Sequence, residues 1–208
     1  MSRLFRTLAA TACLIAAAPA FAAHVRFDTD PFAGSTADPD DGVRTVFGGN
    51  ERQLPAFDLA VDRFVFNPGV FDLPGGLNFT SGLASALPGA GVNVVVLQSI
   101  DNDGNPATPF NAGTAASLIA AAIEEDGAGF FIYHNSGLQL NRLVYSTNLN
   151  SATADLSILA RITTPTGAQA VALLPAFTAD NFTVPEPGTW ALALLGRGAA
   201  ALGRRRTG

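Results

Sequence analysis

Short apolar runs separated by turn residues predict a body made mainly of β-strands. The runs cover residues 43–47, 57–66, 92–99, 129–134, 138–146 and 156–163. In the second run, Phe57, Leu59 and Val61 alternate with Asp58, Ala60 and Asp62, which is the period of a half-buried strand. The 21 glycines and 13 prolines are concentrated between the runs. We therefore expect antiparallel sheets in a sandwich-like arrangement.

Two stretches between these runs predict short helices. Residues 114–126 place Leu118, Ile119 and Ile123 on one face and end before a glycine, which is typical of a helix C-terminus. Residues 167–174 follow a threonine that can serve as N-cap and end before a proline. The predicted fold class is therefore mainly β with two short helices.

The first 22 residues have the pattern of a secretory signal peptide. Arg3 and Arg6 precede an apolar run that is too short to span a bilayer as a stable anchor. Ala20-Phe21-Ala22 places small residues where signal peptidase requires them, so we expect a signal helix that is cut off after Ala22. The cut would also remove Cys13, the one cysteine of the chain, which suits an oxidising exterior.

The remaining chain divides into three parts. Residues 23–42 are rich in Asp, Pro and Gly and predict an irregular lead-in. Residues 43–183 contain all the strand-like runs and predict a single β-rich globular domain. Residues 184–208 predict a tail with a short membrane-spanning helix.

This tail combines a proline motif, an apolar stretch and a basic end. The motif is Val184, Pro185, Glu186 and Pro187, and the apolar stretch covers residues 190–203. The basic end is Arg204, Arg205 and Arg206, which the positive-inside rule places on the cytoplasmic side of a membrane. The prolines separate the tail from the folded body, because they fit neither a regular helix nor a central strand.

In content and order, the tail resembles the PEP-CTERM sorting signal, which an exosortase processes. The resemblance implies that Val184 to Pro187 form the recognition motif and that Arg204 to Arg206 form the retention signal. It also implies export across the inner membrane of a Gram-negative-type bacterium, transient anchoring through the tail helix, and final display on the cell surface or release outside. Arg197 interrupts the apolar stretch at a cost of about 2.5 to 3.5 kcal/mol on insertion scales, which weakens the anchor. Residues 129–182 resemble a segment found in the bodies of such proteins, and this second resemblance implies no activity.

Charge and composition restrict what the body can do. The chain has a net charge of −5, but residues 23–187 hold six arginines and all 17 acidic residues. Such an acidic body should repel nucleic acid, since phosphates are bound by cationic side chains. Cations or neutral polymers such as exopolysaccharide are the more plausible partners. The chain has no lysine, which excludes a P-loop and Schiff-base chemistry.

Two polar positions suggest chemistry within the body. Asp101, Asp103 and Asn105 present oxygen side chains at alternate positions around a glycine turn, which favours calcium as a ligand. The simpler interpretation is an Asx-rich turn without a metal, and we expect no other cofactor. His134 ends an apolar run, where a histidine either has a structural role or acts as a general base.

Together these features predict a non-enzymatic protein of the cell surface or extracellular matrix. Its processing partners would be signal peptidase and exosortase, and its ligand would be exopolysaccharide. Two alternatives remain open. The first is a calcium-dependent binding module. The second is a secreted hydrolase built on pairs of acidic residues, which a cleft that holds His134 with a carboxylate would favour.

Overall fold

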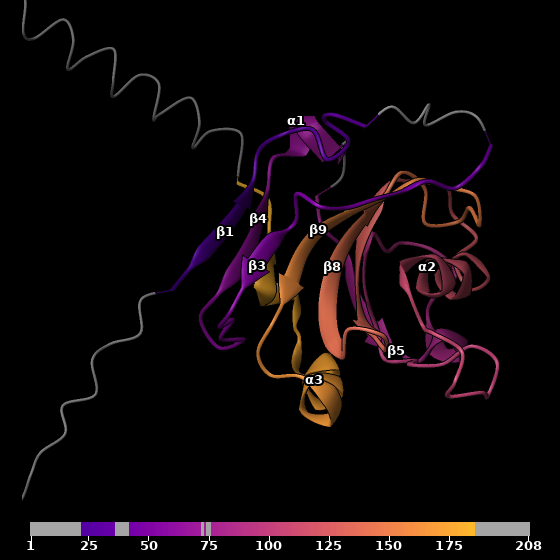
Figure 1. Ribbon diagram of the computed structural model, residues 1–208. Coiled ribbons are helices and arrows are strands. Elements are labelled where there is room, and N and C mark those ends of the chain that lie inside the picture. The colour runs from indigo at the N-terminus through magenta and orange to yellow at the C-terminus, as the bar shows by residue number, and fades with distance from the viewer. Residues whose placement is uncertain (1–21, 36–41, 72, 74–75, 186–208) are drawn as a thin grey trace, which may run out of the picture.

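The computed structural model describes residues 22–35, 42–71, 73 and 76–185 (Figure 1). Its strands are β1 (His24–Phe27), β2 (Val46–Phe47), β3 (Arg52–Leu54), β4 (Arg63–Phe66), β5 (Phe79–Gly82), β6 (Val94–Leu97), β7 (Gly129–Asn135), β8 (Leu140–Ser146), β9 (Leu156–Ile162) and β10 (Phe182–Thr183). Its helices are α1 (Pro68–Phe71), α2 (Ala112–Ala120) and α3 (Gly167–Leu173), with 3-10 turns η1 (Ala84–Ala86), η2 (Leu174–Ala176) and η3 (Ala179–Asn181). The prediction of a mainly β body with a few short helices is confirmed.

A seven-stranded mixed sheet forms the centre of the molecule. Its order is β2-β9-β8-β7-β6-β5, and β3 also pairs with β9. The β7–β8 and β8–β9 pairings are antiparallel, whereas the other six pairings among the described residues are parallel. The expectation of antiparallel sheets was therefore wrong for most pairings. A tight hairpin needs only a few connecting residues, and residues 136–139 provide such a link between β7 and β8, whereas residues 98–128 form a long crossover between β6 and β7.

A three-stranded parallel sheet, β1-β4-β10, covers one face of the large sheet. Aromatic rings fill the space between the two sheets. Phe66 of β4 stacks on Phe130 of β7 with ring centroids 3.8 Å apart, and Phe71 contacts the edges of both Phe130 and Tyr145. The two layers therefore share one core, which is made largely of aromatic rings.

Helix α2 covers the opposite face of the large sheet (Figure 1). It packs Ala115, Ala116 and Ile119 against strand residues such as Val95 and Phe131. The helix runs from Ala112 to Ala120, so it starts two residues before the predicted range and stops six residues before its end. Its start is explained by Asn111, whose side chain accepts hydrogen bonds from the N–H groups of Gly113 and Thr114. The second predicted helix is observed as α3.

The segment before β4 differs from its predicted strand. Residues 59–61 form a turn, and the strand begins only at Arg63. Asp58 Oδ1 accepts the N–H of Ala60, and Asp62 Oδ2 accepts the N–H of Asp58, so side chains take the place of strand partners. Asp62 Oδ1 also accepts the N–H of Ala23, which fixes the start of β1. Strand β1 lies within residues 23–42, where the sequence predicts an irregular lead-in.

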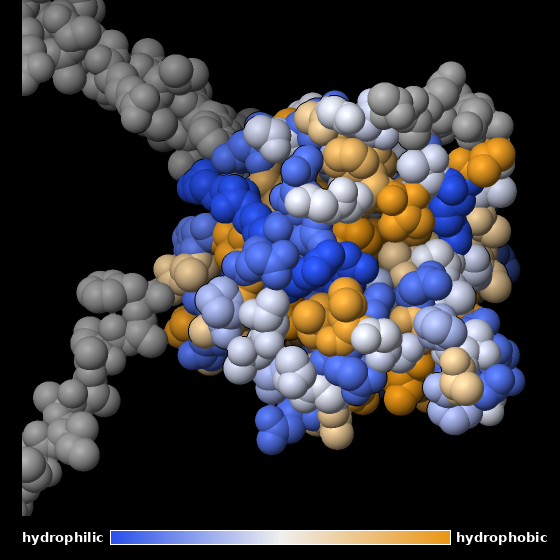
Figure 2. Space-filling model, viewed as in Figure 1, coloured by the Kyte–Doolittle hydropathy of each residue, from blue (hydrophilic) through white to orange (hydrophobic). Residues whose placement is uncertain are grey.

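The surface of the described body is mixed in hydropathy. On the face drawn in Figure 2, hydrophilic residues gather over β1 and β3, and hydrophobic residues form separate patches. Within the described ranges, no helix has the length and apolar character needed to cross a bilayer. The predicted signal helix and tail helix lie outside the described residues, apart from the first residues of the tail.

Candidate functional site

A cavity of about 460 Å³ lies where β6 and β7 end. We call it the His134 cavity. It is lined by His134 and Ser136 from the end of β7, by Ile100 and Asp101 after β6, and by Gly167 and Val171 from α3, among others. The carboxyl ends of parallel strands are a common position for ligand sites in sheets of this kind. This is therefore the first candidate site of the body.

Helix α3 closes one side of the cavity. The N–H of Gly167 donates to the carbonyl of Gln139 at 2.7 Å, which attaches the first turn of α3 to the β7–β8 hairpin. Gly167 has φ of +61°, a conformation that glycine adopts without the strain of a Cβ. On the other side, Ser136 Oγ accepts the N–H of Phe110 at 2.7 Å. Hydrogen bonds from backbone N–H groups thus hold both sides of the cavity wall in place.

The imidazole of His134 is held in place by Asn141 on the neighbouring strand. The residue is 4% exposed, and Nδ1 lies 3.2 Å from Oδ1 of Asn141 on β8. Burial lowers the pKa of His134 below its usual value, although the hydrogen bond to Asn141 acts in the opposite direction. The imidazole is therefore neutral at pH 7. The sequence left His134 between a structural and a chemical role, and its place in the cavity wall allows both.

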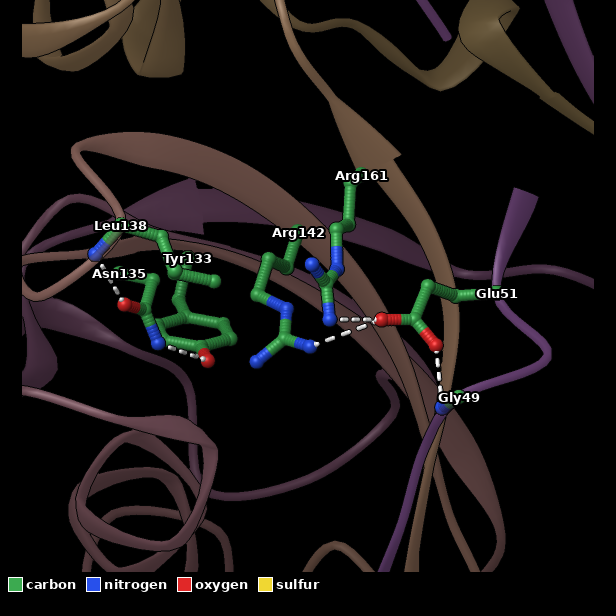
Figure 3. A network of polar contacts seen from close by, with 7 residues as sticks. All are labelled: Gly49, Glu51, Tyr133, Asn135, Leu138, Arg142 and Arg161. Atoms are coloured by element: carbon green, nitrogen blue, oxygen red, sulfur yellow. Dashed lines mark hydrogen bonds and ion pairs between the residues drawn. The ribbon is translucent and has the colours of Figure 1, made fainter. Parts of the chain in front are cut away.

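A second polar cluster is drawn in Figure 3. It lies on the other face of the same sheet, because Arg142 follows Asn141 on β8 and successive strand residues point to opposite faces. Glu51, just before β3, faces Arg142 of β8 and Arg161 of β9, and we call these three residues the arginine cluster. Oε1 of Glu51 pairs with Arg161 and, at 3.4 Å, with Arg142. Oε2 accepts the N–H of Gly49 at 2.5 Å. The Glu51 side chain is 2% exposed, so one buried carboxylate links two guanidinium groups.

Burial and hydrogen bonding act in opposite directions on this carboxylate. Burial alone would raise the pKa of Glu51, but backbone hydrogen bonds from Glu51 and Gly49 and the charges of Arg161 and Arg142 together lower it. Next to the cluster, burial raises the pKa of Tyr133, whose hydroxyl accepts a hydrogen bond from Asn135 at 3.0 Å. The carboxylate form of Glu51 is therefore favoured, and the cluster joins β8 and β9 to the segment before β3.

Sequence reasoning did not identify the arginine cluster. A usable signal was present, because Arg142 and Arg161 are each the one charged residue of a strand that is otherwise uncharged and mostly buried. A charge in the middle of a buried strand requires a partner. The partner, Glu51, lies 91 residues from Arg142 in the chain, and no local pattern points to it.

The loop proposed for calcium adopts three successive Asx turns. Asp101 Oδ1 accepts the N–H of Asp103, Asp103 Oδ1 accepts that of Asn105, and Asn105 Oδ1 accepts that of Ala107. The backbone hydrogen bond from Asp103 is the main reason why the pKa of Asp101 is lowered. Within the described ranges, no group of three or more His, Cys, Asp or Glu residues is placed to hold a metal ion. Calcium binding through Asp101, Asp103 and Asn105 stays a prediction.

The sorting tail starts at the edge of the folded body. Strand β10 ends at Thr183, and Val184 packs against the core between the two sheets. Pro185 is the last described residue. The other predicted motif residues, Glu186 and Pro187, lie outside the described residues, as do Arg204, Arg205 and Arg206.

Comparison with known proteins bears on this tail and not on the body. Neither a curated protein nor a solved structure matches the chain. A family model, the PEP-CTERM protein-sorting motif, matches residues 183–206. The match covers the motif residues and the basic end that the sequence predicted, and it implies export and membrane-associated sorting by an exosortase in Gram-negative bacteria. The chain therefore carries a PEP-CTERM protein-sorting motif directly after the last strand of its folded body.

Proposed function

We propose that this protein is a non-enzymatic component of the cell surface or extracellular matrix that associates with neutral exopolysaccharide. In this proposal, signal peptidase removes residues 1–22, and an exosortase then acts on the tail. The observation that carries the proposal is the continuity between body and tail. Thr183 is both the last residue of β10 and the first residue of the sorting match. The folded body is thus the part of the protein that would be exported when the tail is sorted.

The charge of the body supports a neutral partner. Residues 23–187 hold six arginines against 17 acidic residues, so an acidic polymer would be repelled. Two of these six arginines, Arg142 and Arg161, are already paired with Glu51. A third, Arg44, donates to the carbonyls of Gly113 and Ala154. These arginines serve the fold, which leaves few cations for binding an anionic chain.

Cell fractionation with and without exosortase tests the sorting step. With exosortase present, an antibody against the body should detect the protein at the surface or in the medium. Without it, a slightly larger species should stay with the inner membrane. Glu186→Gln removes the charge of the motif and should reproduce the second result in cells that have exosortase, whereas Asp180→Asn, an exposed acid just before the motif, should not. Identical fractionation in both strains would refute the proposal.

One observation favours a secreted hydrolase as a second candidate function. His134 and Asp101 line the same cavity, and a histidine with a carboxylate can serve acid–base catalysis. However, within the described part of the chain His134 and Asp101 form no hydrogen bond with each other, and Asn141 rather than a carboxylate orients the imidazole. Release of reducing ends from neutral polysaccharide, lost in His134→Asn, would support the hydrolase. Binding without any release would support the primary proposal.

A further inference from the structure

The hydrogen bonds around Asn141 define which nitrogen of His134 carries the proton. Asn141 is 1% exposed, and its Nδ2 donates to the carbonyl of Ala170 at 2.7 Å. This bond orients the amide, so Oδ1 is the atom that faces Nδ1 of His134 at 3.2 Å. An amide oxygen only accepts, and Nδ1 must therefore be the donor. In the neutral imidazole the other nitrogen, Nε2, then carries a lone pair.

This lone pair has no partner within the described part of the chain. The recorded hydrogen bond of His134 uses Nδ1 alone. Among the described side chains, the fully buried polar atoms without a partner are Nε of Arg142 and Nε of Arg161. Nε2 of His134 is not one of them, so it keeps contact with open space, and the space that His134 lines is the cavity. The protein thus presents a hydrogen-bond acceptor of fixed orientation to a cavity large enough for a small molecule.

The other polar groups of the cavity indicate what such a molecule carries. Ser136 Oγ accepts the N–H of Phe110, which leaves its hydroxyl hydrogen to be donated. Thr108 contributes a second hydroxyl, and Asp101 contributes a carboxylate, which only accepts when ionised. Among the described residues that line the cavity there is no arginine, and the ionisable ones are His134 and Asp101. An anionic ligand would therefore meet a negative carboxylate without a compensating cation.

Apolar side chains supply the rest of the wall. Ile100, Pro106 and Val171 line the cavity, and Ile100 is 45% exposed. A ligand that covers them would remove apolar surface from water. The cavity therefore suits a molecule with both hydroxyl groups and a C–H surface.

We propose that the His134 cavity binds a neutral, hydroxyl-rich ligand of the saccharide class, with one ligand hydroxyl donating to Nε2 of His134. The inference deepens the proposed function and rests on it, because it names the site at which the body would contact a neutral polysaccharide. It identifies His134 as a binding residue whose acceptor atom, Nε2, is already oriented in the absence of ligand. Such preparation lowers the cost of ordering the site on binding.

The test uses the purified full-length chain and a panel of neutral tetrasaccharides with different linkages, with a tetrasaccharide of uronic acids as the charged comparison. The chain has two histidines, His24 and His134, so imidazole NMR signals report directly on the site. A neutral tetrasaccharide should shift the Nε2 signal of His134 and leave the exposed His24 unchanged. The uronic acid compound should bind more weakly or not at all.

Two variants separate the acceptor from the shape of the cavity. His134→Asn keeps a donor for Asn141 but removes the Nε2 acceptor, and it should weaken binding about fivefold, as expected for one neutral hydrogen bond. Ala168→Trp fills the cavity from the exposed side of α3 and should abolish binding. Ala152→Trp, the matched control, lies in the exposed β8–β9 connection at the other end of the sheet and should bind like the original chain.

The outcomes distinguish the site from the function. If neutral saccharides bind but Ala168→Trp binds equally well, the cavity is not the site, while the proposed function survives. If no neutral saccharide binds, both the site and the polysaccharide role are refuted, whereas the sorting step is still judged by fractionation. Tighter binding of the uronic acid compound would overturn the neutral class of ligand.

Discussion

The arginine cluster and the His134 cavity place polar groups on opposite faces of one strand, and they use them differently. Asn141 and Arg142 are neighbours on β8, and successive strand residues point to opposite faces. Arg142 meets its charged partner within the fold, whereas Asn141 orients His134 so that an acceptor faces open space. The first cluster is built to hold strands together. The second leaves Nε2 of His134 as an unused hydrogen-bond acceptor, which is the feature expected of a binding site.

The largest expected effect comes from breaking the arginine cluster. Glu51→Gln should lower the free energy of unfolding by about 3 kcal/mol, because it leaves two guanidinium groups without their carboxylate. We expect the low end of the range for buried pairs, since the Arg161 side chain is 31% exposed and water can screen it. Urea denaturation of the full-length chain measures the change. Glu124→Gln, the same substitution at an exposed site, should stay within about 0.5 kcal/mol.

A combined variant tests whether the cluster serves structure alone. Replacing Glu51 with Leu, and Arg142 and Arg161 with Met, removes every charge of the cluster at once. A purely structural ion pair can be replaced by apolar residues of similar volume with little loss. The triple variant should therefore recover most of the stability that Glu51→Gln loses, and it should leave saccharide binding unchanged. A loss of binding would contradict the division between the two clusters.

The next largest effect is expected at Asn141. Asn141→Leu removes the donor to Ala170 and the acceptor for His134, so two buried polar groups lose their partner. The expected loss is about 2 kcal/mol in unfolding free energy. The pKa of His134 should also fall, because the bond to Asn141 raises it. NMR titration of the imidazole measures this shift, and Asn102→Leu, at an exposed position, should change neither quantity.

Sequence reasoning located the strands better than their pairing. The apolar run around Val94–Leu97 marks a strand buried on both faces, and β6 confirms it. The short strand β3, by contrast, reads Arg-Gln-Leu and is a strand only because β9 provides its partner. The relative direction of the strands was predicted wrongly, because turn residues occur in a crossover connection as often as in a hairpin. Local pattern therefore predicts which residues are buried, and pairing depends on contacts that are distant in the chain.

The same limit applies to the two polar clusters. His134 was noticed because it ends an apolar run, but its role depends on Asn141 and Ala170, which no spacing rule connects to it. The tail is the opposite case. Its proline motif and basic end follow one another in the chain, and the family match over residues 183–206 confirms the resemblance to the PEP-CTERM sorting motif that they carry.

A smaller effect is expected when acid protonates Glu51. The pKa of this carboxyl is lowered in the folded chain, so its stabilising contribution is complete above the unfolded value of 4.5. The contribution is lost as the pH falls from there through the folded pKa. The stability difference between the original chain and Glu51→Gln should therefore shrink as the pH falls from about 5 through the folded pKa. Urea denaturation across this range measures it, and a constant difference would contradict the assigned ionisation.

The smallest effect, and the one that separates the two clusters most clearly, is expected at His134. Its pKa is lowered by burial, so the unfolded chain takes up a proton more readily than the folded chain. The stabilising contribution of the neutral imidazole is complete above the unfolded pKa of 6.5. Below that pH, the free energy of unfolding falls by at most about 1.4 kcal/mol per pH unit. Urea denaturation should show this slope in the original chain and in His24→Gln, but not in His134→Asn. A neutral saccharide whose hydroxyl donates a hydrogen bond to Nε2 should steepen the slope, because it binds the unprotonated ring. An unchanged slope with bound saccharide would mean that the ligand does not contact Nε2.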